Sequence, residues 1–293
     1  MKVAIYGQVL AEHDVVYVQE LLAELKAVKA TIAIEAYFLS LLQNYSGFED
    51  FPTFTQNEGL DTSYKLFVSF GGDGTMLRAI TYIGHLGIPI VGVNTGRLGF
   101  LSTFKKQEVR KVVTAFMANE YSIEERSMVS IGMDSGQETL GAHNFALNEI
   151  TVSRKDTTSM ITVETFLDGE YLTAYWADGL IIATPTGSTG YSLSCGGPVI
   201  APTAQSFVIT PIAPHNLSAR PLVIDDRTKI RLKVSGREES HLVSLDSRIA
   251  TIPNSTEITV EKSPFTVKMV VYQSESFLKT LRNKLLWGED KRN

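Results

Sequence analysis

The sequence predicts an α/β N-terminal domain with a mostly parallel sheet, followed by a β-rich, sandwich-like C-terminal domain. The chain has 293 residues, enough for two domains of roughly 150 residues each. In the first third, strand-like and helix-like segments alternate, which is typical of right-handed βαβ units around a parallel sheet. From about Tyr121 to Tyr272, short strand-like runs recur between turn signals instead.

The elements of the first domain follow from apolar runs and helical spacing. A helix is predicted over Asp14–Ala30, where apolar residues recur every three or four positions. Another helix is predicted over Met76–Ile83, and an amphipathic segment, Lys105–Asn119, leads to the second domain. We expect a loop over Asn44–Ser63 and strands at Lys2–Tyr6, Thr31–Ile34, Leu66–Phe70 and Ile88–Val93.

The second domain is predicted to consist mainly of short strands. Asp168-Gly169 lies between two strand-like runs and is a strong signal for a two-residue hairpin turn. We place the domains at residues 1–120 and 121–273, with a C-terminal helix in 274–293 packing back on the first domain. The expected strands are Met160–Leu167, Tyr171–Tyr175, Gly179–Ala183, Phe207–Ile212, Lys229–Val234, Glu257–Val260 and Thr266–Val271.

Composition excludes several classes of protein. The net charge of −5 provides no basic field for nucleic acid or an anionic membrane. No apolar run approaches the ~18 residues of a membrane span. The single cysteine, Cys195, excludes an internal disulfide and a multi-cysteine metal site, which fits a cytoplasmic location. The chain has no Walker lysine motif, GxGxxG fingerprint or HExxH motif.

The sharpest motif is Gly71-Gly72-Asp73-Gly74-Thr75, between a predicted strand and a predicted helix. Glycines allow close backbone approach to a ligand, and helix N-termini attract phosphate. Asp73 suits proton acceptance or cation binding, whereas the simpler alternative is a tight turn with Asp73 as helix cap. Arg78, one turn into the helix, either faces phosphate or is solvated. The phosphate candidates are Gly71, Gly72, Thr75 and Arg78.

A second motif covers Asp178–Pro198, where an apolar strand runs into a segment dense in hydroxyl groups and glycine. Thr189–Ser194 is expected to form a short helix whose N-terminus faces an anion, and Tyr191 is expected either to stack on a base or to hydrogen-bond a sugar. A polar, turn-rich loop is the alternative. Asn148-Glu149, which follows an apolar stretch, is uninformative by itself.

Taken together, these segments resemble the NAD kinase family. The resemblance runs in order through GGDGT at 71–75, NTGRLGFL at 94–101, NE at 148–149, DGLIIATPTGSTGYSLSCGGP at 178–198, PIAPHNLSARPLV at 211–223 and SLD at 244–246. GGDGT alone is shared by phosphofructokinases and diacylglycerol-type lipid kinases, whereas the 178–198 block is far more specific.

The resemblance implies roles for particular residues. Asp73 matches the family's proton acceptor, with Gly74 beside the ligand. Asn148 and Glu149 match a pair that holds the adenosine ribose and phosphate region, and Asp178 matches an acid near the nicotinamide end. The remaining NAD-binding candidates are the adenine-side loop, Thr189, Gly190, Tyr191, Ser192, Leu193 and Ser194, and Ala213, in a strand lining the nicotinamide side. The chain departs from some relatives at Trp176 and Arg248.

The implied reaction transfers the γ-phosphoryl group of ATP to the 2′-hydroxyl of the adenosine ribose of NAD, giving NADP. The resemblance implies Mg²⁺ bound with ATP and a homodimer or homotetramer. The alternatives are a lipid or sugar kinase that shares the GGDGT turn, and a non-catalytic dinucleotide-binding sensor.

Overall fold

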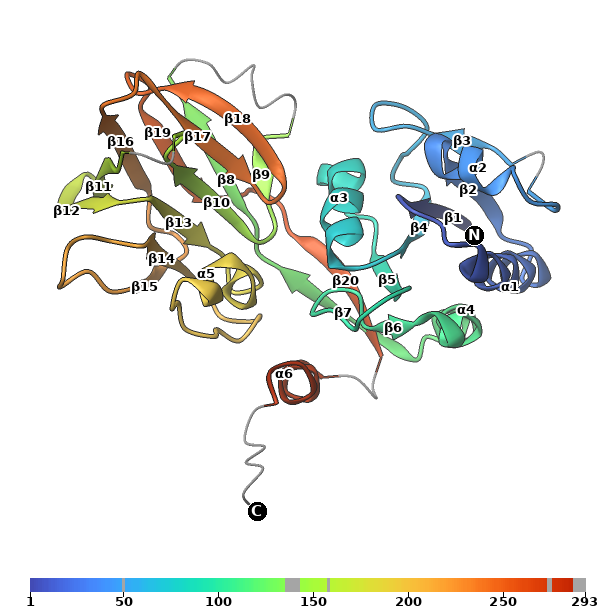
Figure 1. Ribbon diagram of the computed structural model, residues 1–293. Helices are drawn as coiled ribbons and strands as arrows, with labels where there is room; N and C mark the ends of the chain where they lie inside the picture. Colours follow the sequence, from blue (N-terminus) through green and yellow to red (C-terminus); the bar gives the residue numbers. More distant parts are fainter. Residues whose placement is uncertain (49–50, 135–142, 157–158, 273–275, 287–293) are drawn as a thin grey trace. The chain divides into compact units, whose positions relative to one another are not determined.

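The computed structural model describes residues 1–48, 51–134, 143–156, 159–272 and 276–286 (Figure 1). The chain divides into two compact units: residues 1–125 with 267–293, and residues 126–266. The boundaries predicted from sequence, 120/121 and 273/274, assign the strand near 266–271 to the β-rich domain, whereas the structure places it in the first sheet. None of the helices in the described part of the chain has the length and apolar character needed to cross a bilayer.

The first unit contains a mostly parallel sheet with strand order β3-β2-β1-β4-β5-β20-β7, and β6 pairs with β5. Its strands are β1 (Lys2–Gly7), β2 (Thr31–Glu35), β3 (Thr53–Phe54), β4 (Tyr64–Phe70), β5 (Ile90–Asn94), β6 (Phe104–Lys105), β7 (Tyr121–Arg126) and β20 (Val267–Tyr272). The central strands are buried along most of their length, as the apolar runs predict. β20 joins this sheet because Met269 pairs in parallel with Ile90.

The described part of the first unit has five α-helices: α1 (Val15–Ala27), α2 (Ala36–Leu42), α3 (Asp73–Ile83), α4 (Val109–Met117) and α6 (Phe277–Leu285). Of these, α1, α2, α3 and α4 pack against this sheet. The spacing that predicts α1 buries Val18, Leu22 and Leu25. Several elements of this unit differ from expectation, including the strands β6 and β7. α2 was not predicted, and the loop expected over Asn44–Ser63 contains the short strand β3.

The second unit is a sandwich of two antiparallel sheets, confirming the expected β-rich fold (Figure 1). Their orders are β15-β14-β13-β10-β17-β18 and β12-β11-β16-β19-β8-β9. The strands are β8 (Val129–Met133), β9 (Phe145–Ala146), β10 (Glu149–Ser153), β11 (Ile161–Leu167), β12 (Glu170–Ala177), β13 (Gly179–Ala183), β14 (Ser206–Ile212), β15 (Leu222–Asp225), β16 (Ile230–Gly236), β17 (Ser240–Leu245), β18 (Arg248–Pro253) and β19 (Ile258–Lys262). A short helix, α5 (Tyr191–Ser194), follows β13.

Alternating side chains of both sheets form one core. Val152 and Ile182 of the first sheet and Val163 and Val260 of the second belong to one buried cluster. The predicted turn at Asp168-Gly169 joins β11 to β12, where Leu167 pairs with Glu170. Both turn residues have positive φ, at 50° and 89°, as a primed two-residue hairpin requires.

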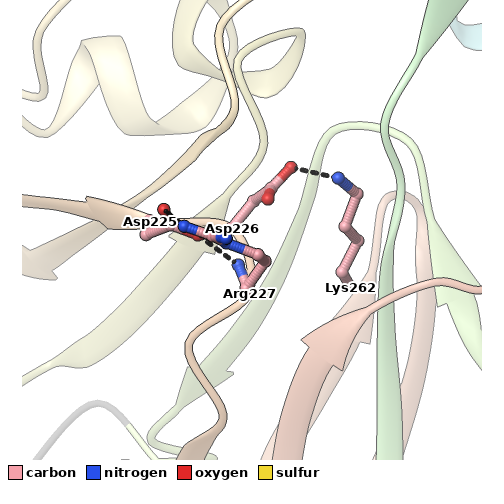
Figure 2. A network of polar contacts seen from close by, with 4 residues as sticks. All are labelled: Asp225, Asp226, Arg227 and Lys262. Atoms are coloured by element: carbon pink, nitrogen blue, oxygen red, sulfur yellow. Dashed lines mark hydrogen bonds and ion pairs between the residues drawn. The ribbon is translucent and has the colours of Figure 1, made fainter.

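An ion pair between a buried aspartate and a partly exposed lysine links the two sheets of this unit (Figure 2). Asp226 directly follows β15 and its side chain is 2% exposed, while Lys262 is the last residue of β19. Lys262 Nζ lies 2.6 Å from Asp226 Oδ2. The neighbouring pair, Asp225 with Arg227, is on the surface. Figure 2 shows both ion pairs: Asp225 and Arg227 pair within one turn, whereas Lys262 reaches Asp226 from β19.

Candidate functional site

The glycine-rich motif of the first unit connects β4 to α3, at the carboxyl end of a parallel strand. Gly71 has φ +154°, and a Cβ there would collide with the Thr75 side chain, so this position needs glycine. The Gly71 N–H donates to the carbonyl of Val93 at 2.8 Å. Gly71 therefore shapes the turn, and its N–H is already used within the fold.

Gly72 and Gly74 leave space on the other side of the turn. A Cβ at either position would meet no atom within 4 Å. Gly72 is the N-cap of α3, and the first N–H groups of a helix have no acceptors within the helix. The motif therefore presents an open, donor-rich surface at the start of α3, which is the kind of surface that binds phosphate.

Asp73, the first residue of α3, points its carboxylate into the loop that follows β5. Its Oδ2 accepts the N–H of Phe100 at 2.7 Å, and its Oδ1 accepts those of Leu101 and Ser102 at 3.1 and 2.9 Å. A Cβ at Gly99 would collide with this carboxylate. The loop over residues 99–102 therefore holds the Asp73 carboxylate in one orientation.

Asn94 and Ser102, buried polar residues, fix that loop in turn. Asn94 Nδ2 donates to the carbonyls of Arg97 and Ser102, at 2.9 and 3.2 Å, and its Oδ1 accepts the N–H of Gly96 at 2.8 Å. The Ser102 hydroxyl donates to the Gly71 carbonyl at 2.9 Å. This segment belongs to the motif NTGRLGFL at 94–101 and the residue after it, and none of these contacts is predictable from the sequence.

Arg78 is exposed on the next turn of α3. It lies close enough to Tyr6 and Tyr82 to lower their pKa, although burial raises the pKa of both phenols above their ordinary value. Tyr82 also donates to Glu35, whose carboxylate caps α2 by accepting the Phe38 N–H. Arg78 thus lies near a polar cluster, and its contact with phosphate stays a prediction.

In the second unit, hydrogen bonds fix the backbone of Asn148 and Glu149 at the start of β10. Asp246, in the turn between β17 and β18, accepts the N–H groups of Leu147, Asn148 and Glu149 at 3.0, 2.8 and 3.2 Å. Thr184 donates its hydroxyl to the Leu147 carbonyl and its N–H to the Asn148 carbonyl. The roles of Asp246 and Thr184 were missed from the sequence.

The side chains of this pair lie beside the second motif. A Cβ at Gly190 would be 3.3 Å from Glu149 Oε2 and 3.7 Å from Asn148 Nδ2. Glu149 Oε2 is buried and has no hydrogen-bond partner among the residues that the structure describes. Burial, with the nearby Asp246 carboxylate as a second cause, raises the pKa of Glu149 to about 8. Burial therefore favours the protonated, neutral form of this carboxyl group.

Residues 189–194, expected on the adenine side of NAD, divide into supporting and exposed residues. Ser192 is buried, and its hydroxyl lies 2.8 Å from that of Thr210, so it supports the loop. Thr189 donates to the Thr186 carbonyl. Tyr191 is 45% exposed, and its pKa is raised by burial and by nearby negative groups that include Asp178 and Glu149. The other members are Gly190 and Leu193, which are partly buried, and Ser194, which is exposed.

Asp178 forms an ion pair with Arg154 at 3.0 Å, with both side chains partly exposed. The backbones also pair, because the Arg154 N–H donates to the Asp178 carbonyl. Ala213 lies just after β14, which ends at Ile212, rather than within a strand as expected. Its φ of +43° is a left-handed conformation that is uncommon for residues other than glycine.

Trp176 and Arg248, the two positions where the chain departs from some relatives, each contact neighbouring residues. Trp176, on β12, is 47% exposed, and its ring centre lies 4.4 Å from that of His215. Arg248 donates to the carbonyl of His143, at 2.5 Å, and to the carbonyl of Phe145. Arg248 therefore fastens the chain ahead of Asn148.

No group of three or more His, Cys, Asp or Glu side chains suited to a metal ion occurs among the described residues. The polar groups gathered at the two motifs are carboxylates, an amide, hydroxyls and backbone N–H groups. Such groups suit the recognition of a phosphorylated, hydroxyl-rich ligand such as a nucleotide.

Comparison with known proteins places the chain in one family. The ATP-NAD kinase N-terminal domain matches residues 16–121, and the ATP-NAD kinase C-terminal domain matches residues 147–272. The NAD kinase of Christiangramia forsetii is 55% identical over 294 residues, covering 100% of both chains. The NAD kinase of Flavobacterium psychrophilum is 53% identical with the same coverage.

Solved structures agree with this assignment. An NAD kinase from Archaeoglobus fulgidus in complex with ATP has a TM-score of 0.70 and 27% identity, covering 97% of each chain. The yeast NADH kinase complexed with NADH shares the fold, with a TM-score of 0.86 at 23% identity over 99% of this chain and 88% of that chain. The family models and the full-length identity lead to one conclusion: the chain belongs to the NAD kinase family.

Proposed function

We propose that this protein transfers the γ-phosphoryl group of ATP to the 2′-hydroxyl of the adenosine ribose of NAD, producing NADP. The observation that carries the proposal is the Asp73 carboxylate, held by three backbone N–H groups beside the open glycines 72 and 74. Family membership supports both substrates.

Asp73 is proposed to be the proton acceptor. An ionised carboxylate offers about four lone-pair sites, and three of these receive N–H groups of residues 100–102. One site, on Oδ2, is left to accept the hydroxyl proton. Phosphoryl transfer depends mainly on positioning and charge stabilisation, and general-base assistance contributes about 10²–10⁴-fold. A carboxylate fixed before substrate arrives serves both needs.

The loop and strand ends of the second unit are proposed to bind NAD. Asn148 and Glu149 provide an amide and a carboxyl group for sugar hydroxyls, next to Gly190. Tyr191 offers an exposed ring for the adenine. Asp178, oriented by Arg154, and Ala213 are assigned to the nicotinamide side. Ser192 is proposed to support the loop through its hydroxyl contact with Thr210 and not to contact NAD.

The phosphate groups of ATP are assigned to the open turn at residues 72–75, with Arg78 on the adjacent helix turn. Mg²⁺ is proposed to arrive with ATP as part of the substrate, since a protein of net charge −5 supplies little positive field. We also propose a cytoplasmic homodimer or homotetramer. Leu217 at 96% exposure and Val223 at 48% are the kind of exposed apolar residues that self-association covers.

The test is incubation of the purified protein with ATP, Mg²⁺ and NAD. We expect a product that an NADP-specific dehydrogenase reduces and whose ³¹P NMR spectrum shows a new phosphomonoester. Phosphorylation of diacylglycerol or a free sugar without NADP formation would favour a lipid or sugar kinase. NAD binding measured by calorimetry without any product would identify a dinucleotide sensor.

A further inference from the structure

The backbone of residues 147–149 is restrained at every polar group. Its three N–H groups donate to the Asp246 carboxylate. Its three carbonyls accept, in order, the Thr184 hydroxyl at 2.6 Å, the Thr184 N–H at 2.9 Å and the Asp246 N–H at 3.0 Å. Asp246 therefore supplies four of the six hydrogen bonds that fix this segment.

The position and backbone conformation of Asp246 suit this role. It occupies the turn between β17 and β18, opposite the start of β10, with a φ of +52°. Aspartate and asparagine tolerate this left-handed conformation better than most residues. Burial raises the pKa of Asp246, while the three N–H donors and then Arg248 oppose this shift.

The restrained segment presents two side chains with hydrogen-bonding capacity to spare. Glu149 Oε2 is buried and has no partner within the described residues, and it lies next to the side-chain-free face of Gly190 together with Asn148 Nδ2. A protonated carboxyl group and an amide each combine a donor with an acceptor. Ribose hydroxyls need that combination.

We propose that Asp246 is a positioning residue for dinucleotide recognition, fixing residues 147–149 so that Asn148 and Glu149 meet the sugar hydroxyls of NAD already oriented. This inference rests on the proposed function, which supplies NAD as the ligand. In this proposal Asp246 acts through its neighbours, because its carboxylate accepts the backbone N–H groups of residues 147–149. The ionisable groups facing Glu149 are Asp246 and Tyr191; Arg248 faces Asp246, while Asp178 and Cys195 face Tyr191.

Asp246→Asn tests the positioning directly. Asparagine tolerates the left-handed φ and keeps one oxygen for the N–H groups of Asn148 and Glu149, but its NH₂ faces the Leu147 N–H and cannot accept it. The lost hydrogen bond loosens the segment in the free protein, so NAD binding must restore its order, and the cost of one such bond corresponds to up to about tenfold in affinity. We expect the Kd for NAD to rise by up to about tenfold, with the KM for ATP unchanged.

Asp168→Asn is the matched control. Asp168 also lies in a hairpin turn with left-handed φ, at +50°, and its carboxylate accepts the Lys229 N–H at 2.9 Å. The same substitution there removes negative charge from a similar turn without touching residues 147–149. We expect its Kd for NAD to match that of the wild type, and thermal unfolding checks whether each variant is folded.

The pH profile separates positioning from a merely structural role. In the wild type, NAD affinity is expected to fall as pH rises through about 8, where Glu149 loses its proton. Asp246→Asn removes a neighbouring negative charge, which lowers the pKa of Glu149. The fall in NAD affinity should therefore occur at lower pH in this variant. Glu149→Gln cannot ionise, so its NAD affinity should not fall as pH rises through about 8. This variant can be measured even if Asp246→Asn fails to fold.

A folded Asp246→Asn protein with the wild-type Kd for NAD and the wild-type pH dependence of that Kd would overturn the inference. A Glu149→Gln protein whose NAD affinity still falls as pH rises through about 8 would also overturn it. Failure of the proposed function is a separate result, because then the wild type itself forms no NADP from ATP and NAD.

Discussion

Two aspartates, Asp73 and Asp246, each gather three consecutive backbone N–H groups. Asp73 could be predicted from its glycine neighbours and the strand-to-helix context. Its partners, 27 to 29 residues away, could not, nor could those of Asp246, 97 to 99 residues away. Local patterns reveal a residue's type and turn, whereas contacts between distant loops depend on the folded sheet.

Gly99→Ala should disturb Asp73 without removing it, because the new Cβ collides with the carboxylate. A displacement of about 1 Å can cost around 10²-fold in rate, so we expect kcat to fall by roughly that factor. Gly96→Ala is the control in the same loop, since a Cβ there meets no atom within 4 Å. Equal steady-state rates for the two variants would contradict the orienting role of this loop.

Glu149 should make the protein less stable as pH rises. Its folded-state pKa is raised to about 8, above the unfolded value of about 4.3, so the folded state binds more protons between these values and stability falls with pH there. Glu149→Gln should remove this loss, with a gain on the order of 4 kcal/mol by pH 8 relative to pH 4. Urea unfolding across this pH range checks it; parallel curves for both proteins would count against it.

At the scale of elements, helices and strands followed well from sequence where the signal was local. Helical spacing located α1, and the Asp168-Gly169 turn located its hairpin. α2 was missed because its start is set by the Glu35 carboxylate, which accepts the Phe38 N–H at 2.8 Å. β20 was recognised as a strand, but its partner, β5, lies far away in the sequence, so its sheet could not be assigned.

The ion pair between β15 and β19 belongs to this scale as well. Lys262→Met leaves the Asp226 carboxylate buried without its cation, and breaking a buried pair typically costs 3–5 kcal/mol; partial exposure of Lys262 suggests about 2–3 kcal/mol. Arg227→Met, which breaks the exposed pair with Asp225, should change stability little. Urea unfolding compares them, and similar midpoints for the two variants would refute a stabilising link between the sheets.

At the scale of the whole molecule, two units with separate cores provide different groups. The first holds the carboxylate and the open glycine turn, and the second holds the amide, carboxyl and aromatic groups. This division agrees with the fold class predicted from alternating elements and short strands. The long block over residues 178–198 pointed to the family, because its order of residues is far more specific than the glycine turn.

Self-association is a prediction for the whole molecule. β12 and β15 are edge strands of their sheets, and exposed apolar side chains lie on them, including Leu172, Trp176 and Val223. Apolar edge strands favour pairing with another chain. Sedimentation equilibrium should give a mass of two or four chains, against 32.3 kDa for one. A monomer at micromolar concentration would contradict it.

Single-turnover formation of NADP by wild type and Asp73→Asn, with the Kd for NAD measured on the same samples, tests the proton-acceptor role most directly. We predict a wild-type Kd in the variant and a rate lower by about 10²–10⁴-fold. A variant that forms NADP as fast as the wild type would show that the proton leaves the ribose hydroxyl by another route.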